Sequence, residues 1–153
     1  MRIFTSGKHA YKTIFSMANK GGVGKSLLST SLAFKLSKMG IKVGILDADV
    51  SSPTVPRMLG MKDTTITADA EKVKPIEYSP TLKFVSVGSH PCIIGNRPTV
   101  WRGERHRDYI TQCLTTVNWG DIDFLIVDFP AGLSDALLGI KRYKRIIDGV
   151  VLI

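Results

Sequence analysis

Short apolar runs alternate along the chain with segments whose apolar residues recur at helical spacing. The run 123–127 is almost continuously apolar, which is typical of a central strand in a parallel sheet. Comparable runs rich in β-branched and aromatic residues predict further strands at 13–17, 42–46, 82–87 and 149–153. Strands that alternate with helices predict an α/β layered fold with a mostly parallel sheet flanked by helices.

The segment 25–39 has the clearest helical periodicity. Its leucines recur every fourth residue from Leu28 to Leu36, with Met39 close behind, so they predict an apolar face. Gly40 is a suitable residue to end this helix.

The remaining segments give weaker signals. Apolar residues on one stripe predict a helix over 104–117, and a shorter helix is expected over 134–147. The prolines within 51–80 predict a short helix followed by irregular loop, and residues 88–99 are also predicted to be loop.

Length and composition indicate one domain, 1–153, that can bury a hydrophobic core of its own. No apolar run approaches the roughly 18 residues of a membrane span, and the N-terminus lacks the features of a secretory signal. The two cysteines, Cys92 and Cys113, argue against a disulfide framework and against a self-contained metal site. We therefore expect a cytoplasmic protein. The acid-free N-terminus resembles an organelle transit peptide. However, only about eleven residues precede the first strand, which is short for that purpose.

The formal charge of +8 is unevenly distributed. No acidic residue precedes Asp47, whereas the segment 1–46 carries eight lysines and arginines and the remainder of the chain is neutral. Such a region attracts a polyanionic ligand, and charge by itself does not separate a nucleotide from a nucleic acid.

A glycine-rich turn between the first strand and the first helix carries the strongest motif, the phosphate-binding loop 20–26. Its glycines let the backbone N–H groups approach a phosphate, and the following helix N-terminus adds partial positive charge. Lys25 is placed to bridge the β- and γ-phosphates of ATP, and the Ser26 hydroxyl to bind Mg²⁺. The residues expected to contact the nucleotide are Gly21, Gly22, Val23, Gly24, Lys25, Ser26 and Leu27.

Carboxylates follow two of the predicted strands. Asp47 and Asp49 come after 42–46, and Asp128 ends the apolar run 123–127. The carboxyl ends of strands border the crevice in which α/β proteins bind ligands. Asp128 has the position of a Walker B acid that holds Mg²⁺ through water, and 129–135 then has the position of a switch that senses the γ-phosphate. Turn-capping roles are the alternative for Asp47 and Asp49.

The motif Lys-Gly-Gly-Val-Gly-Lys-Ser, with Asn19 where a glycine is usual, resembles the deviant phosphate loop of plasmid-partition, division-site and iron–sulfur-carrier ATPases. The resemblance implies that these proteins dimerise around nucleotide and that Lys20 reaches the partner's phosphates, as an arginine finger does. It also implies that Asp49 orients the attacking water and that Asp47 supports the magnesium shell.

Further stretches are similar to one branch of this family, the Mrp-type iron–sulfur cluster carrier ATPases. They lie at 49–60, 72–76, 100–103 and 117–123, in the family's order. This chain departs from the family pattern at Leu27, at 50–52, and at Ala131, Leu133 and Ser134. The last three lie in the second switch, so an altered switching or hydrolysis is the expected consequence.

The resemblance implies binding of ATP with Mg²⁺, slow hydrolysis, a homodimer, and delivery of a [4Fe–4S] cluster to client apoproteins. Family members bind that cluster through a C-terminal Cys-x-x-Cys, which neither Cys92 nor Cys113 matches. We therefore expect this chain to be an N-terminal fragment, with cluster carriage implied by the family and by no residue present here.

Two other functions stay open. The basic N-terminal half would suit a partition or positioning switch that binds DNA or membrane in an ATP-dependent way, and the departures would suit a degenerate nucleotide-binding module. The basic cluster 141–145, which includes Tyr143, could touch nucleic acid, although a solvated helix face is the favoured interpretation.

Overall fold

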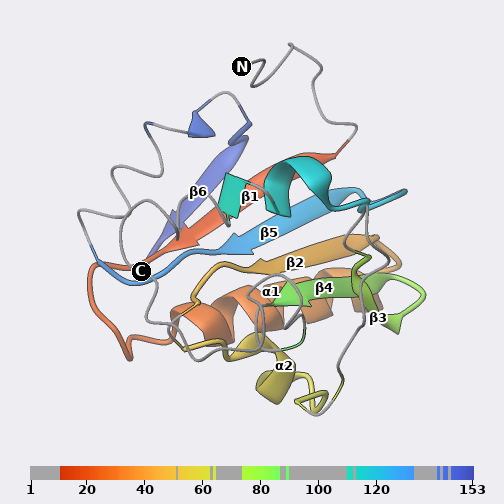
Figure 1. Ribbon diagram of the computed structural model, residues 1–153, viewed down its shortest axis with the longest axis horizontal. Coiled ribbons are helices and arrows are strands. Elements are labelled where there is room, and N and C mark those ends of the chain that lie inside the picture. Colours follow the sequence, from red (N-terminus) through yellow and green to blue (C-terminus); the bar gives the residue numbers. More distant parts are fainter. Residues whose placement is uncertain are drawn as a thin grey trace.

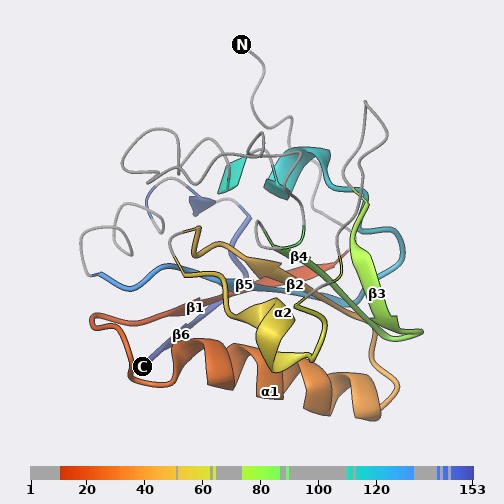
Figure 2. The same cartoon turned by 60° about the horizontal axis from the view of Figure 1, so that its bottom comes forward.

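The computed structural model describes residues 11–50, 52–62, 64, 74–86, 89, 110–111, 113–132, 141, 143–144 and 146–153. Within these residues one sheet forms the centre of the molecule, with helix α1 (Lys25–Lys38) across one face. Helical residues at 110–111 and 113–116 cover the opposite face (Figure 1 and Figure 2). The layered α/β prediction is therefore confirmed.

The described residues form a sheet of six strands in the order β3-β4-β2-β5-β1-β6. Adjacent strands are parallel except for the β3–β4 pair at one edge, which is antiparallel. The strands are β1 (Lys12–Met17), β2 (Val43–Asp47), β3 (Ile76–Ser79), β4 (Leu82–Ser86), β5 (Phe124–Asp128) and β6 (Gly149–Leu152). Five of them lie where the apolar runs predicted them, within one or two residues at each end.

Strand β3 corrects the prediction that residues after the short helix up to 80 are irregular loop. The short helix itself is present as α2 (Val55–Met58). Strand β3 has only four residues between Pro75 and Pro80, and it is held by its antiparallel pairing with β4. Prolines are tolerated at the ends of an edge strand, so Pro75 and Pro80 are compatible with β3. The strand was not predicted because it depends on tertiary pairing with β4.

Helix α1 ends as predicted, with Met39 as its C-cap and Gly40 in the left-handed region at φ 84°. The predicted leucine stripe is confirmed only in part, because Leu32 and Leu36 pack against the core but the stripe does not extend to the ends of the helix. Leu28 is 42% exposed and Met39 is 64% exposed, whereas Ser29 and Ala33 are buried. Small side chains let the helix backbone approach the sheet closely, so the helix turns these residues inward and leaves Leu28 at its flank.

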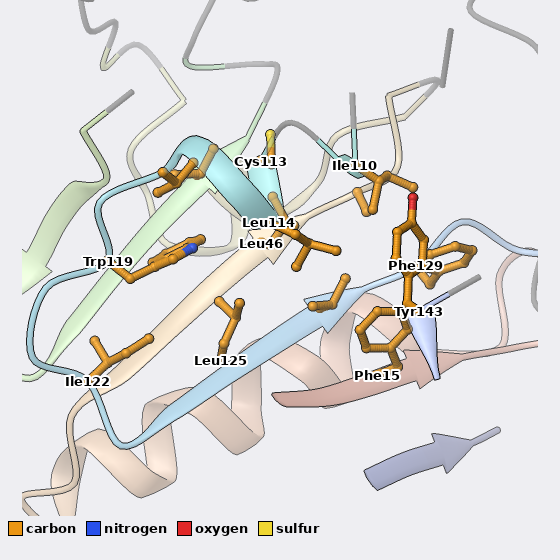
Figure 3. Close-up of a cluster of buried hydrophobic side chains, with 14 of the residues drawn as sticks. Phe15, Leu46, Ile110, Cys113, Leu114, Trp119, Ile122, Leu125, Phe129 and Tyr143 are labelled. Atoms are coloured by element: carbon orange, nitrogen blue, oxygen red, sulfur yellow. The ribbon is translucent and has the colours of Figure 1, made fainter. Parts of the chain in front are cut away.

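Two clusters of buried side chains pack on the two faces of the sheet. The α1-side cluster contains Ala33, Val43, Ile45, Val55, Leu59, Ile76, Leu82, Phe84 and Ile126. The opposite face carries a larger group, here called the aromatic cluster, whose members include Phe15, Leu46, Trp119, Leu125, Phe129 and Tyr143 (Figure 3). The sheet therefore has apolar contacts on both faces, as the continuous apolar runs indicated.

Tyr143 shows how the predicted basic cluster is built. Its ring lies 6.0 Å from that of Phe15 within the aromatic cluster (Figure 3). Its hydroxyl lies 2.9 Å from Thr111 Oγ1. The aromatic side chain is buried, whereas Lys141 and Lys144 are exposed. The interpretation of a solvated helix face is therefore the better one, because no aromatic ring is available at this cluster for stacking on a base.

Several predictions fall outside the described residues. These concern 104–109 and 112 of the second predicted helix, 133–140 of the third, most of the loop 88–99, the stretch 100–103, Cys92, Leu133 and Ser134. Among the described residues, no helix is long and apolar enough to cross a membrane.

Candidate functional site

The phosphate loop joins the end of β1 to the start of α1, and residues 19–24 are all exposed. Gly22 and Gly24 have φ values of 76° and 92°, a conformation that side-chain-bearing residues rarely adopt. A Cβ atom built on Gly21, Gly22 or Gly24 would meet no atom within 4 Å, so open space borders the loop. Gly24 is the N-cap of α1 and no side chain caps that end. The first N–H groups of α1 therefore have no side-chain cap, and an uncapped helix N-terminus of this kind suits an anion.

The lysine of the loop and the acid at the end of β5 meet in a buried ion pair. Lys25 Nζ lies 2.8 Å from Asp128 Oδ1, although 103 residues separate them in sequence. Lys25 Nζ also donates to Ser26 Oγ at 3.2 Å. A second side chain reaches the Asp128 carboxylate, because Ser29 Oγ lies 2.8 Å from Asp128 Oδ1. Asp128 Oδ2 is buried and has no hydrogen-bond partner.

Asp128 belongs to a line of buried polar residues, here called the polar row, formed by Ser16, Asp128, Asp47 and Ser86. Strand register places Ser16 beside Asp128, Asp128 beside Asp47, and Asp47 beside Ser86, on β1, β5, β2 and β4. Residues two positions earlier, such as Ile126, belong to the α1-side cluster. Because strand side chains alternate between faces, the polar row lies on the α1 face at the carboxyl ends of these strands.

Asp47 is fully buried and serves as an acceptor for three different segments. Its oxygens accept hydrogen bonds from the N–H of Asp49 (3.3 Å), from the N–H of Val55 (3.1 Å) and from Ser86 Oγ (3.1 Å). Burial, together with the neighbouring charge of Asp128, raises the pKa of Asp47 to about 7. Its expected role near magnesium stays a prediction; the contacts seen here tie the end of β2 to β4 and to the start of α2.

The other predicted site residues occupy the segments around the loop. Asp49 is partly exposed, and its Oδ1 accepts a hydrogen bond of 3.1 Å from the N–H of Ser52. Lys20, Val23 and Leu27 are exposed on the loop and the first turn of α1. Their roles stay predictions, and the local bond to Ser52 is the kind that the turn-capping alternative for Asp49 requires.

The start of the predicted switch is attached to the loop strand. The N–H of Phe129 donates to the carbonyl of Ser16 at 3.0 Å, and the N–H of Gly132 donates to the carbonyl of Ala18 at 3.0 Å. These bonds fasten the segment after Asp128 to the end of β1, directly before the phosphate loop.

Sequence reasoning missed Ser16, Ser29 and Ser86. Each is a small hydroxyl residue inside an otherwise apolar or helical run, where it is usually assigned to packing. The available signal was position, because Ser16 and Ser86 lie near the carboxyl ends of predicted strands, close to where Asp47 and Asp128 follow theirs. No group of three or more His, Cys, Asp or Glu side chains with metal-site geometry occurs in the part of the chain that the structure describes.

This arrangement defines a P-loop NTPase. A glycine loop precedes a helix, and the lysine of that loop forms an ion pair with an acid at the end of a neighbouring parallel strand. The chain belongs to the family described as "ParA: NUBPL iron-transfer P-loop NTPase", whose model matches residues 9–153. This finding confirms the resemblance to iron–sulfur-carrier ATPases.

Individual proteins agree with this assignment. The chain is 40% identical to an iron-sulfur cluster carrier protein of Methanococcus maripaludis over 95% of this chain and 50% of that protein. It is 37% identical to a cytosolic Fe-S cluster assembly factor NUBP2 homolog of Dictyostelium discoideum, over 92% of this chain and 54% of the relative. A nucleotide-binding protein of Archaeoglobus fulgidus solved with ADP superposes with a TM-score of 0.72 at 30% identity, over 93% of this chain and 53% of that one. The chain therefore spans about half the length of the relatives it matches.

Proposed function

We propose that this chain is the nucleotide-binding part of a cytoplasmic iron–sulfur cluster carrier, which binds ATP with Mg²⁺ and hydrolyses it slowly. The observation that carries the proposal is the buried contact between Lys25 and Asp128 beneath an open glycine loop. The names of the relatives support the carrier function, and the ADP-bound structure of a related protein supports the choice of a nucleotide as ligand.

Nucleotide binding would use groups already in place. The backbone N–H groups of the loop and the N-terminus of α1 receive the phosphates. Lys25 holds an acidic partner at 2.8 Å, so its ammonium would exchange the Asp128 carboxylate for phosphate oxygens as the nucleotide enters. Lys20, exposed on the loop, would reach the partner's phosphates in a homodimer.

The residues present fit a magnesium ion. Asp128 Oδ2 is a buried acceptor with no partner, and Ser26 supplies a hydroxyl at the start of the helix. Hard oxygen donors of this kind suit Mg²⁺, which usually keeps several waters. When bound, the ion would neutralise charge on the β- and γ-phosphates. Asp49, on the segment between β2 and α2, would orient the attacking water.

The iron–sulfur cluster is the cargo in this proposal. Cys113 is buried in the aromatic cluster and is the single cysteine among the described residues, so these residues offer no pair of thiolates for a cluster. We propose that the full-length carrier holds a [4Fe–4S] cluster outside the segment described here. The nucleotide state of this domain would then control release of the cluster to client apoproteins.

The test replaces the loop lysine. We expect Lys25→Ala to weaken ATP binding by about 100-fold or more, because it removes the phosphate-binding cation and leaves the buried Asp128 charge without its cation. The matched control is Lys35→Ala on the exposed side of the same helix. Calorimetric titration with ATP and Mg²⁺ measures both variants. An affinity for Lys25→Ala equal to that of the parent would overturn the phosphate-loop assignment.

The same preparation tests turnover. We expect Asp49→Ala to bind ATP as the parent does and to lose most phosphate release, because Asp49 is assigned to the attacking water. Equal rates of phosphate release from the variant and the parent would remove Asp49 from the mechanism.

A further inference from the structure

Ser29 is a buried hydroxyl at the site that no motif identified. It lies one turn after Lys25 on α1, and it is 1% exposed. Its Oγ lies 2.8 Å from Asp128 Oδ1 and 3.0 Å from the carbonyl oxygen of Lys25. A hydroxyl has one proton, so Ser29 can donate to only one of these acceptors at a time.

The two acceptors are not equivalent. A serine inside a helix commonly donates to the carbonyl four residues earlier, and that interaction adds little stability. A carboxylate accepts a shorter and stronger hydrogen bond than a neutral carbonyl does. The carboxylate is also the closer of the two here, so Asp128 is the better partner for the Ser29 proton.

The contacts of Asp128 are distributed unevenly between its oxygens. Oδ1 receives both Lys25 and Ser29, whereas Oδ2 is buried without a partner. In the proposed function Lys25 exchanges Asp128 for phosphate. Of the two side-chain donors at Oδ1, only Ser29 would then remain.

We propose that Ser29 is a positioning residue for Asp128, whose hydroxyl holds Oδ1 so that Oδ2 stays available to the magnesium shell. The inference rests on the proposed magnesium role of Asp128 and adds a residue that acts through it. It predicts that Ser29 affects the dependence of nucleotide binding on Mg²⁺ more than it affects nucleotide binding as such. A residue needed only for packing would affect both together with thermal stability.

The test compares two serine-to-alanine changes on the same helix. Ser29→Ala removes the buried hydroxyl, and Ser31→Ala removes an exposed one. Affinity for a non-hydrolysable ATP analogue is measured by calorimetry, first in EDTA and then at rising Mg²⁺ concentration. We expect Ser29→Ala to keep the affinity measured in EDTA within about twofold. It should raise the Mg²⁺ concentration for half-maximal effect about tenfold or more, as loss of an outer partner of a metal ligand does. Ser31→Ala should match the parent in both measurements.

The outcomes separate this inference from the proposed function. If the parent protein itself binds no nucleotide, the proposed function fails. If the parent binds and the Mg²⁺ midpoint of Ser29→Ala equals that of the parent, only the positioning role of Ser29 is overturned. A parallel loss of EDTA affinity and melting temperature in Ser29→Ala overturns it as well, since that pattern indicates a structural role.

A second pair of variants tests the route of the effect. In an Asp128→Asn background, Ser29→Ala should shift the Mg²⁺ midpoint no further, because the residue through which Ser29 acts has already been changed. An equal shift in both backgrounds would show that Ser29 acts by another route, and it would overturn the inference.

Discussion

The two faces of the sheet use the same strands for different purposes. On the α1 face the strands end in the polar row, where Ser16, Asp128, Asp47 and Ser86 lie side by side in register. On the opposite face the neighbouring positions carry the aromatic cluster, in which Phe15 stacks on Phe129 at 5.6 Å (Figure 3). Adjacent residues of one strand, such as Phe15 and Ser16, therefore serve packing on one face and the candidate site on the other.

The difference shows how a small domain can keep charged groups buried. Lys25, Asp128 and Asp47 would be costly to bury without partners, and they are supported by ion-pair and hydrogen-bond contacts across α1, β2, β4 and β5. The aromatic cluster supplies apolar contacts on the opposite face of those strands. We therefore expect changes to the aromatic cluster to alter stability, and changes to the residues of the candidate site on the α1 face to alter ligand binding.

The largest expected effect is on the aromatic face. Trp119 is 2% exposed, and a Cβ built on Gly44 would lie only 2.7 Å from its ring, so the indole packs directly on the β2 backbone. We expect Trp119→Ala to lower the free energy of unfolding by about 3–5 kcal/mol. Urea denaturation measures this loss, with Met39→Ala at an exposed methionine as the control. Nucleotide affinity of the folded variant should stay within about twofold of the parent, and a tenfold loss would break the division between the faces.

A change in the polar row should have the next largest effect on the free energy of unfolding, and this effect depends on pH. The pKa of Asp47 rises from about 4 to about 7 on folding, so the folded state holds a proton that the unfolded chain has lost. The resulting stability is complete below about pH 4 and is lost as the pH rises through about 7. Asp47→Asn lacks this titration. We therefore expect the unfolding free energy of the variant to improve relative to that of the parent between pH 4 and pH 7, by a few kcal/mol at most.

Urea unfolding without nucleotide or metal, at pH values across that window, measures the Asp47 effect. Asp121→Asn is the control of opposite sign, because Lys42 lowers the pKa of the exposed Asp121 carboxyl. Stability from Asp121 is present above about pH 4 and is lost as the pH falls. A constant difference between Asp47→Asn and the parent over the whole window would contradict the prediction.

The smallest expected effect is at Tyr143. Tyr143→Phe keeps the ring beside Phe15 and removes the hydroxyl that contacts Thr111 Oγ1 at 2.9 Å. We expect a loss of about 1 kcal/mol in the free energy of unfolding, measured by urea denaturation. Thr111→Val tests the same contact from its other side, and the two losses together should be less than additive. Full additivity would show that the two hydroxyls do not act as a pair.

Much of the fold was predictable because the strands of a parallel sheet are apolar throughout. The runs that end at Asp47 and Asp128 identified β2 and β5, and the glycine loop identified the start of α1. Strand β3 was not predictable, because four residues between prolines have no periodicity and gain their structure from pairing with β4. The leucine spacing of α1 was correct only in part, because Leu32 and Leu36 pack against the α1-side cluster but Leu28 does not, and the small residues Ser29 and Ala33 are buried as well.

The candidate site was predictable only in part. Lys25, Ser26 and Asp128 follow from motif spacing and their place at strand and helix ends. Ser29 and Ser86 do not, because a serine in a helix or a strand has many possible partners and the sequence does not indicate which one it meets. The burial of Tyr143 also lay beyond the sequence, since a basic segment with an aromatic residue is compatible with both a solvated face and a nucleic-acid contact.

The order of residues along the chain by itself determined the phosphate loop, the parallel sheet and the acids that end two of its strands. These features are local, because they depend on glycine conformation, apolar runs and the residues that close them. Only the tertiary structure decided which side chains meet: Lys25 with Asp128, Ser29 with the same carboxylate, and Asp47 with Ser86 and the start of α2. The physical reason is that strand order and register bring distant residues to one edge of the sheet, and a single strand cannot specify its neighbours.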